Sequence, residues 1–156
     1  MDELIDSYTA GPGLLREAIA GMSADDLKAR PVAGRWSTLE VVCHLADADG
    51  VYAERIKRVL AEDKPPLRSM NPDEWQARLA YHERDAEEEL RHVEFTRRQM
   101  ARILRSLAPA DFQRTGHHSE AGPLTLETLL RRVTEHVPHH VQFIQEKRTM
   151  LAKKSL

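Results

Sequence analysis

One helix start signal constrains the fold more than any other feature of this 156-residue sequence. Ser37 and Glu40 have the spacing of a capping box, and Trp36 and Val41 stand at the positions of a hydrophobic staple. Apolar residues then recur at helical spacing until a Pro-Pro pair stops the pattern just after Asp63. The sequence therefore predicts a long amphipathic helix that begins immediately after the capping serine.

Three further segments have helical periodicity, and no convincing strand pattern competes with them. They cover residues 2–20, 72–107 and 125–153. Gly11-Pro12-Gly13 interrupts the segment 2–20 and can split it. The segment 72–107 has a candidate break near Tyr81-His82. Ser23 can cap one short extra turn. We expect residues 111–123 to form a polar loop.

Four helices of this length, joined by short connections, most simply make an all-α antiparallel four-helix bundle with short extra helices. A chain of 156 residues can bury one real core but is too short for two domains of ordinary size. We therefore predict a single four-helix-bundle domain over residues 1–156. The connection that follows the helix predicted to end near Asp63 is a candidate for a longer crossover.

Charge and hydropathy exclude several classes of partner. The formal net charge is −2, whereas nucleic-acid binders usually concentrate Lys and Arg on one face, so no nucleic-acid partner is expected. The acidic start, with Asp2 and Glu3, does not resemble a secretory signal, and no segment is long enough to cross a membrane. The single cysteine, Cys43, excludes an intramolecular disulfide. We expect a cytoplasmic protein without a membrane partner.

Three histidines fall on stripes that should face the inside of the bundle. His136 and His140 are one helical turn apart in the last helix, so both rings leave the same face, and His44 can approach from another helix. His139 lies to the side of this stripe. A buried imidazole without a partner is hard to accommodate, which makes a metal site the leading hypothesis. The alternative is that ordinary core histidines with hydrogen bonds occupy these positions.

Other metal arrangements fit less well. A zincin needs a glutamate directly after its first histidine, where Val137 stands, and a di-iron bundle needs two Glu-x-x-His helices, whereas only Glu89 and His92 have that spacing. Three imidazoles with few carboxylates favour a single Zn²⁺ or Ni²⁺ ion, with Fe²⁺ as a further candidate.

The same residues carry a family resemblance that covers essentially the whole chain. The segments Gly34-Arg-Trp-Ser37, Glu40-Val-Val-Cys-His44-Leu-Ala-Asp47 and His136-Val-Pro-His139-His140 resemble the signature of the DinB/YfiT-like superfamily of four-helix bundles. The resemblance implies a metal held by His44, His136 and His140, and a homodimer. Similar proteins include S-transferases and isomerases that use bacillithiol, mycothiol or glutathione.

We therefore expect a metal-dependent enzyme that acts on a small-molecule substrate, because three protein ligands leave coordination positions of the ion open. Thiol-dependent S-transfer, with a low-molecular-weight thiol as cosubstrate, is the first reading because the family resemblance implies it. A metal-dependent hydrolase is one alternative, and a non-catalytic, dimeric metal-binding bundle is another.

Three charged residues complete the predicted site. We expect Asp47 or Glu40 to orient His44 or to move a proton, and Arg55 to hold an anionic group of the substrate. Each of these charged residues also fits an ordinary solvated helix surface. Cys43 aligns with the apolar stripe, so we assign it to the core and not to catalysis. The remaining candidates, His117 and His118, are assigned to the surface.

Overall fold

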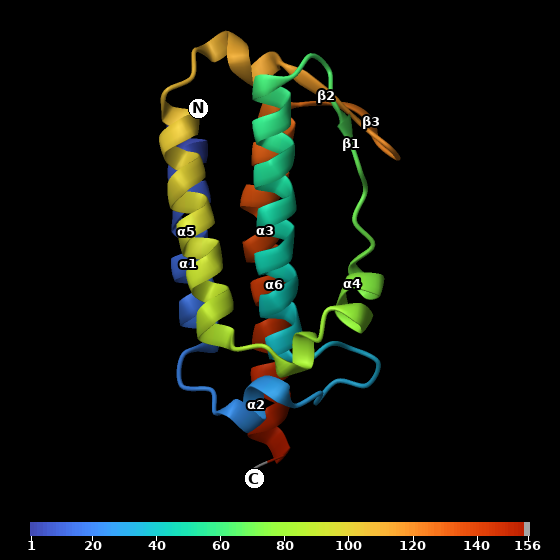
Figure 1. Ribbon diagram of the computed structural model, residues 1–156. Helices are drawn as coiled ribbons and strands as arrows, with labels where there is room; N and C mark the ends of the chain where they lie inside the picture. Colours follow the sequence, from blue (N-terminus) through green and yellow to red (C-terminus); the bar gives the residue numbers. More distant parts are fainter. Residues whose placement is uncertain (155–156) are drawn as a thin grey trace.

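The computed structural model describes residues 1–154 and is a four-helix bundle with a small sheet at one end (Figure 1). The long helices are α1 (Asp2–Ile19), α3 (Thr38–Ala61), α5 (Ala86–Arg105) and α6 (Leu126–Lys154). Their connections contain the short helices α2 (Ala24–Lys28) and α4 (Pro72–Arg78) and the 3₁₀ turns η1 (Tyr81–Glu83) and η2 (Pro109–Gln113). The predicted four-helix bundle is confirmed.

Each bundle helix contacts two others: α1 and α3 both pack against α5 and α6. Helices α1 and α6 run in one direction, and α3 and α5 run in the other (Figure 1). Helices α3 and α5 are parallel because residues 62–85 return along the bundle, which is the longer crossover that the sequence suggested. Helices α3 and α6 are therefore antiparallel neighbours, and they carry the three histidines.

Helix α3 begins where the sequence predicted. The Ser37 hydroxyl accepts a hydrogen bond from the Glu40 amide at 3.1 Å, and the Glu40 carboxylate accepts one from the Ser37 amide at 2.7 Å. The carboxylate is fully buried, and Arg30 and Gln76 also donate to it. Trp36 packs against the apolar cluster that contains Val41. This start fixes which face of α3 each later residue occupies.

Helix α1 continues through Gly11-Pro12-Gly13, so the expected interruption is absent. Pro12 has no amide hydrogen and leaves the carbonyl of Tyr8 without its helical donor. Nη1 of Arg97 donates to that carbonyl at 2.9 Å. Gly11 provides the space, because a Cβ there would lie 2.1 Å from the same nitrogen. A side chain from α5 therefore compensates for the proline.

The guanidinium of Arg97 links all four long helices. It donates to both carboxylate oxygens of Asp49 on α3, at 2.5 and 2.9 Å, and to the carbonyl of Val133 on α6 at 3.0 Å. The side chains of Arg97 and Asp49 are only 1% and 0% exposed. Because a buried charge needs a counter-ion and complete hydrogen bonding, this group fixes the relative positions of the helices.

The expected polar loop at residues 111–123 is instead η2 followed by a hairpin. Strands β2 (Thr115–His118) and β3 (Gly122–Thr125) are antiparallel, and β1 (Pro66–Leu67) pairs with β2 in parallel. Gly116 allows close approach to the bundle, because a Cβ there would lie 2.8 Å from the Leu67 side chain. These strands are too short and too polar for periodicity to show them, so the prediction of a loop was wrong.

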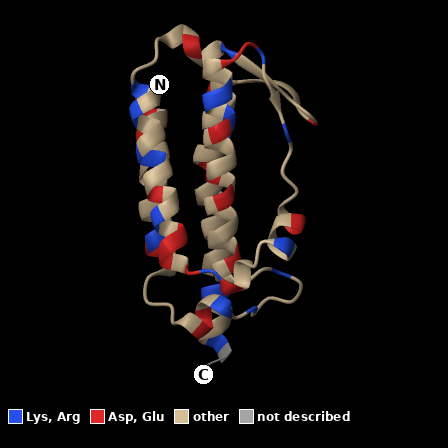
Figure 2. Cartoon of the chain, in the orientation of Figure 1, with Lys and Arg blue, Asp and Glu red and all other residues tan. Residues whose placement is uncertain are grey.

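The segment expected to form the third helix consists of α4, η1 and α5, with the break at Tyr81-His82 where the sequence indicated. Basic and acidic residues alternate along the helices, as Figure 2 shows for one face. No helix within residues 1–154 is long and apolar enough to span a membrane.

Candidate metal centre

The structure brings His44 of α3 together with His136 and His140 of α6. Nε2 of His44 lies 3.1 Å from Nε2 of His136, and the three ring centroids are 4.6 to 4.9 Å apart. One ring nitrogen from each residue lies within 4.8 Å of the other two. His44 is buried and the other two are half-buried. The predicted convergence of rings from two helices is thus present.

All three imidazoles are neutral at pH 7. Burial lowers the pKa of His44 to about 4. Burial, reinforced by the neighbouring imidazoles, lowers the pKa values of His136 and His140 to about 3. Neutral imidazole is the form that binds a metal ion. The Nδ1 atoms of all three residues are buried without a hydrogen-bond partner, so the contact between Nε2 of His44 and Nε2 of His136 satisfies the polar atoms of the cluster only in part.

The donor set fits a divalent ion of borderline softness. Nitrogens at 2.0–2.1 Å from a tetrahedral ion would lie roughly 3.3 Å from one another. The 3.1 Å between His44 and His136 is close to that value, and the ligand nitrogens of all three residues lie within 4.8 Å of one another. Three neutral imidazoles suit Zn²⁺, Ni²⁺ or Fe²⁺.

Aromatic rings surround the three imidazoles. The indole of Trp36 meets the ring of His44 edge to face at 5.3 Å, so the hydrophobic staple of α3 also packs on the site. Phe143 contacts both His139 and His140. The ring of His139 is exposed and does not belong to the group of three, in agreement with the sequence analysis.

Two cavities reach the histidines. One of about 210 Å³ is lined by His44 and His136, together with Arg55 and His118. The other, of about 370 Å³, is lined by His140 and by residues around the start of α3. An ion at the histidines would therefore be accessible to small molecules. This access distinguishes the site from a closed structural one.

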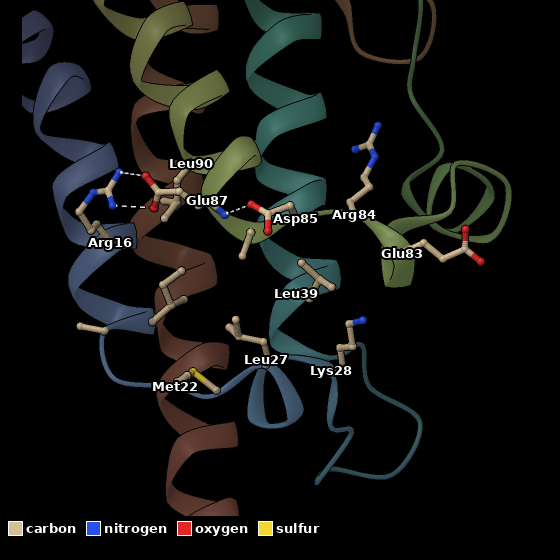
Figure 3. Close-up of a pocket in the computed structure, with 14 residues that line it drawn as sticks. Arg16, Met22, Leu27, Lys28, Leu39, Glu83, Arg84, Asp85, Glu87 and Leu90 are labelled. Atoms are coloured by element: carbon tan, nitrogen blue, oxygen red, sulfur yellow. Dashed lines mark hydrogen bonds and ion pairs between the residues drawn. The ribbon is translucent and has the colours of Figure 1, made fainter.

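A further hollow of about 570 Å³ lies between the ends of α1, α3 and α5 and has no histidine in its lining. Figure 3 shows Arg16 bonded to Glu87 at its edge, with Leu27, Leu39 and Leu90 around it. Its lining includes the carboxylates of Glu83, Asp85 and Glu87, but among the described residues only the three histidines lie close enough together to hold an ion. We therefore place the functional site at the histidines.

The two predicted carboxylates make their hydrogen bonds away from the histidines. Asp47 pairs with Arg84 at 3.2 Å and makes no hydrogen bond to His44, and Glu40 is occupied by the capping box and Arg30. Neither carboxylate orients an imidazole in this structure. Arg55, in contrast, lines the cavity that also contains His44.

Two of the three minor candidates, Cys43 and His117, lie where the sequence analysis assigned them. Cys43 is buried, its thiol donates to the Tyr81 carbonyl at 3.4 Å, and burial raises its pKa to about 12, so it is a core residue as predicted. His117 is exposed, as expected. His118 is half-buried and lines the cavity beside His44 and His136, which the sequence analysis missed. Its only signal in the sequence was its place in the polar segment at residues 111–123.

Similar proteins are described in terms that fit a metal site in a four-helix bundle. The sequence model of the DinB superfamily matches residues 7–144. The solved structure of YfiT from Bacillus subtilis, described as a probable metal-dependent hydrolase with an unusual four-helix-bundle topology, superposes with a TM-score of 0.90. That match has 26% identity and covers 97% of this chain and 87% of the other.

Curated relatives have similar names. A protein of Geobacillus thermodenitrificans is 34% identical over 140 residues, which are 88% of this chain and 78% of that protein. A protein of Oceanobacillus iheyensis is 26% identical over 144 residues, 92% of this chain and 83% of its own length. Both are provisionally named metal-dependent hydrolases.

Proposed function

Because this chain belongs to the DinB superfamily, we propose that it is a metal-dependent hydrolase of a small-molecule substrate. The observation that carries the proposal is the convergence of three neutral imidazoles between two open cavities, one lined by His44 and His136 and the other by His140. His44, His136 and His140 would hold the ion. Zn²⁺ and Ni²⁺ are the favoured ions and Fe²⁺ is the alternative, because imidazole suits all three.

The hydrolytic reading is preferred to thiol transfer, which the sequence analysis placed first. The relatives' names support hydrolysis, and none of those reported above mentions a thiol. The proposal therefore adopts the alternative that the sequence analysis kept open.

The chain's own residues provide three things for this chemistry. The two-helix arrangement presents neutral nitrogens, Trp36 packs against the His44 ring, and the cavity beside His44 and His136 admits a substrate of limited size. A divalent ion bound there would act as a Lewis acid and would make water acidic enough to serve as a nucleophile at neutral pH.

Reconstitution of the purified protein tests the proposal. The protein is stripped with a chelator, reloaded with Zn²⁺, Ni²⁺ or Fe²⁺, and assayed with a panel of carboxylic esters and amides in H₂¹⁸O. We expect turnover that depends on the ion, with ¹⁸O in the acid product. Parallel assays with bacillithiol, mycothiol or glutathione and an electrophile examine the transferase reading.

The variant His44→Ala, checked for fold by circular dichroism, should lose hydrolysis, while His117→Ala, which alters an exposed histidine, should retain it. A metal-loaded protein that hydrolyses nothing in the panel but transfers a thiol would overturn the proposal. Hydrolysis that persists after the ion is removed would do the same.

A further inference from the structure

Arg55 is a buried cation without a bound counter-ion. Its side chain lies on α3 and the residue is 6% exposed. Nη2 donates to the carbonyl of Arg68, the guanidinium lies 5.2 Å from the ring centre of Tyr52, and Nε is buried with no hydrogen-bond partner. No carboxylate forms an ion pair with it among residues 1–154, because the adjacent Glu54 pairs with Arg58.

Comparison with Arg97, which is also buried, shows which hydrogen-bond acceptors Arg55 lacks. Arg97 has both oxygens of Asp49 and two carbonyls around its guanidinium. Arg55 has one carbonyl and an aromatic face. An unpaired buried charge is costly, and an anion that supplies the missing acceptors would relieve that cost. Burial lowers the pKa of Arg55; the nearby Tyr52 and Glu54 raise it, and Arg132 lowers it.

His118 adds a second donor to the same cavity. Its Nδ1 accepts hydrogen bonds from the amides of Glu120 and Ala121, both at 3.2 Å. A neutral imidazole that accepts at Nδ1 carries its hydrogen on Nε2, so that nitrogen is a donor. Burial and Arg55 lower the pKa of His118, which keeps the ring neutral.

The cavity connects this donor pair with the histidine centre. His44, Ala48, Tyr52 and Arg55 line it from one stripe of α3. Eleven residues of helix separate the Cα atoms of His44 and Arg55 by about 16 Å. The two are therefore at opposite ends of the stripe, and a ligand that reaches both must be elongated.

We propose that Arg55 and His118 form an anion subsite that binds the carboxylate or phosphate group of the substrate several bonds away from the group that reacts at the histidines. The anion subsite stands on its own geometry, whereas its use in catalysis rests on the proposed function. Guanidinium groups bind both kinds of anion through paired hydrogen bonds, so the test includes one of each.

Calorimetric titration of the metal-free protein with glutarate and with glycerol 3-phosphate tests the subsite without any assay of activity. We expect at least one anion to bind, and Arg55→Met to weaken binding about tenfold or more. Arg58→Met is the matched control, because that arginine is exposed on the same helix and has carboxylate partners of its own; it should change binding less than twofold. Glu120→Gln should strengthen binding, since it removes a nearby negative charge.

The outcomes separate the two proposals. Absence of binding of both anions at millimolar concentration, or equal binding by wild type and Arg55→Met, overturns the subsite. If Arg55→Met does not fold, Arg55→Lys decides: the planar fork is lost, so severalfold weaker binding supports the subsite and unchanged binding overturns it. In the metal-loaded protein, hydrolysis of mono-4-nitrophenyl glutarate should exceed that of 4-nitrophenyl valerate. Failure of both esters, with anion binding intact, counts against the hydrolase and leaves the subsite standing.

Discussion

Nε2 of His44 and Nε2 of His136 lie 3.1 Å apart, although 92 residues separate them in the sequence. The contact depends on two facts: the capping box at Ser37 sets the face of α3 on which His44 lies, and the crossover after α3 leaves α6 as its antiparallel neighbour. The centre is therefore a product of helix packing. Predictions about it must treat metal binding and bundle stability together.

The metal-free protein should lose stability as the pH falls from 7 to 4. In the unfolded chain a histidine takes up its proton near pH 6.5, whereas folded His44, His136 and His140 stay neutral until about pH 4 or 3. The unfolded state thus binds more protons, and the free energy of unfolding falls by up to roughly 4 kcal/mol per pH unit if all three contribute. The effect begins below pH 6.5 and is complete near pH 3.

Urea denaturation at a series of pH values, with a chelator present, measures this loss. The double variant His136→Ala/His140→Ala should show a shallower dependence, and His117→Ala, which removes an exposed histidine, should follow the wild type. Parallel curves for wild type and the double variant would contradict the assignment of depressed pKa values.

Replacement of Arg97 should be severe. Arg97→Met leaves Asp49 as an uncompensated buried charge and removes donors from Tyr8 and Val133, so we expect a loss of about 3–5 kcal/mol in urea denaturation. Arg91→Met is the control, because Arg91 is 64% exposed in its ion pair and should cost less than about 1 kcal/mol. A loss below about 1 kcal/mol for Arg97→Met would show that this group does not hold the bundle together.

Two glycines in α1 should respond in opposite directions to the same change. Gly13→Ala adds a methyl group to open space and should stabilise the protein by about 0.5–1 kcal/mol through helix propensity. Gly11→Ala would place its Cβ 2.1 Å from Nη1 of Arg97 and should destabilise by about 1–3 kcal/mol or more. Thermal and urea denaturation of both variants provide the comparison. Stabilisation by both would mean that the guanidinium does not occupy the position described.

The sequence predicts those parts of the fold that local chemistry determines. The start of α3 follows from the Ser37 and Glu40 capping box, and the break at Tyr81 lies where the sequence analysis placed a candidate break. The continuity of α1 through Pro12 could not be predicted, because the donor that replaces its amide comes from Arg97, 85 positions away. The hairpin was missed for a similar reason: Gly116 matters through contacts with Leu67 and Val59 on other elements.

Local sequence patterns likewise predict only a part of the candidate site. Helical periodicity is enough to align His136 with His140 and to turn His44 inward. It cannot show that Asp47 prefers Arg84 as a partner, because that arginine lies in the connection before α5. Nor can it show that a residue of the hairpin, His118, faces the same cavity as Arg55. Partners from irregular segments are set by tertiary packing, which leaves no periodic trace.

The stoichiometry of bound metal in a matched pair of variants tests the central claim most directly. After incubation with Zn²⁺ or Ni²⁺ and removal of free ion, elemental analysis should find one equivalent in the wild type and in His139→Ala. His136→Ala, verified as folded by circular dichroism, should retain almost none, since loss of one of three ligands weakens binding by far more than the tenfold to roughly 100-fold typical of outer-shell partners. Equal metal content in folded His136→Ala and His139→Ala would contradict the three-histidine centre.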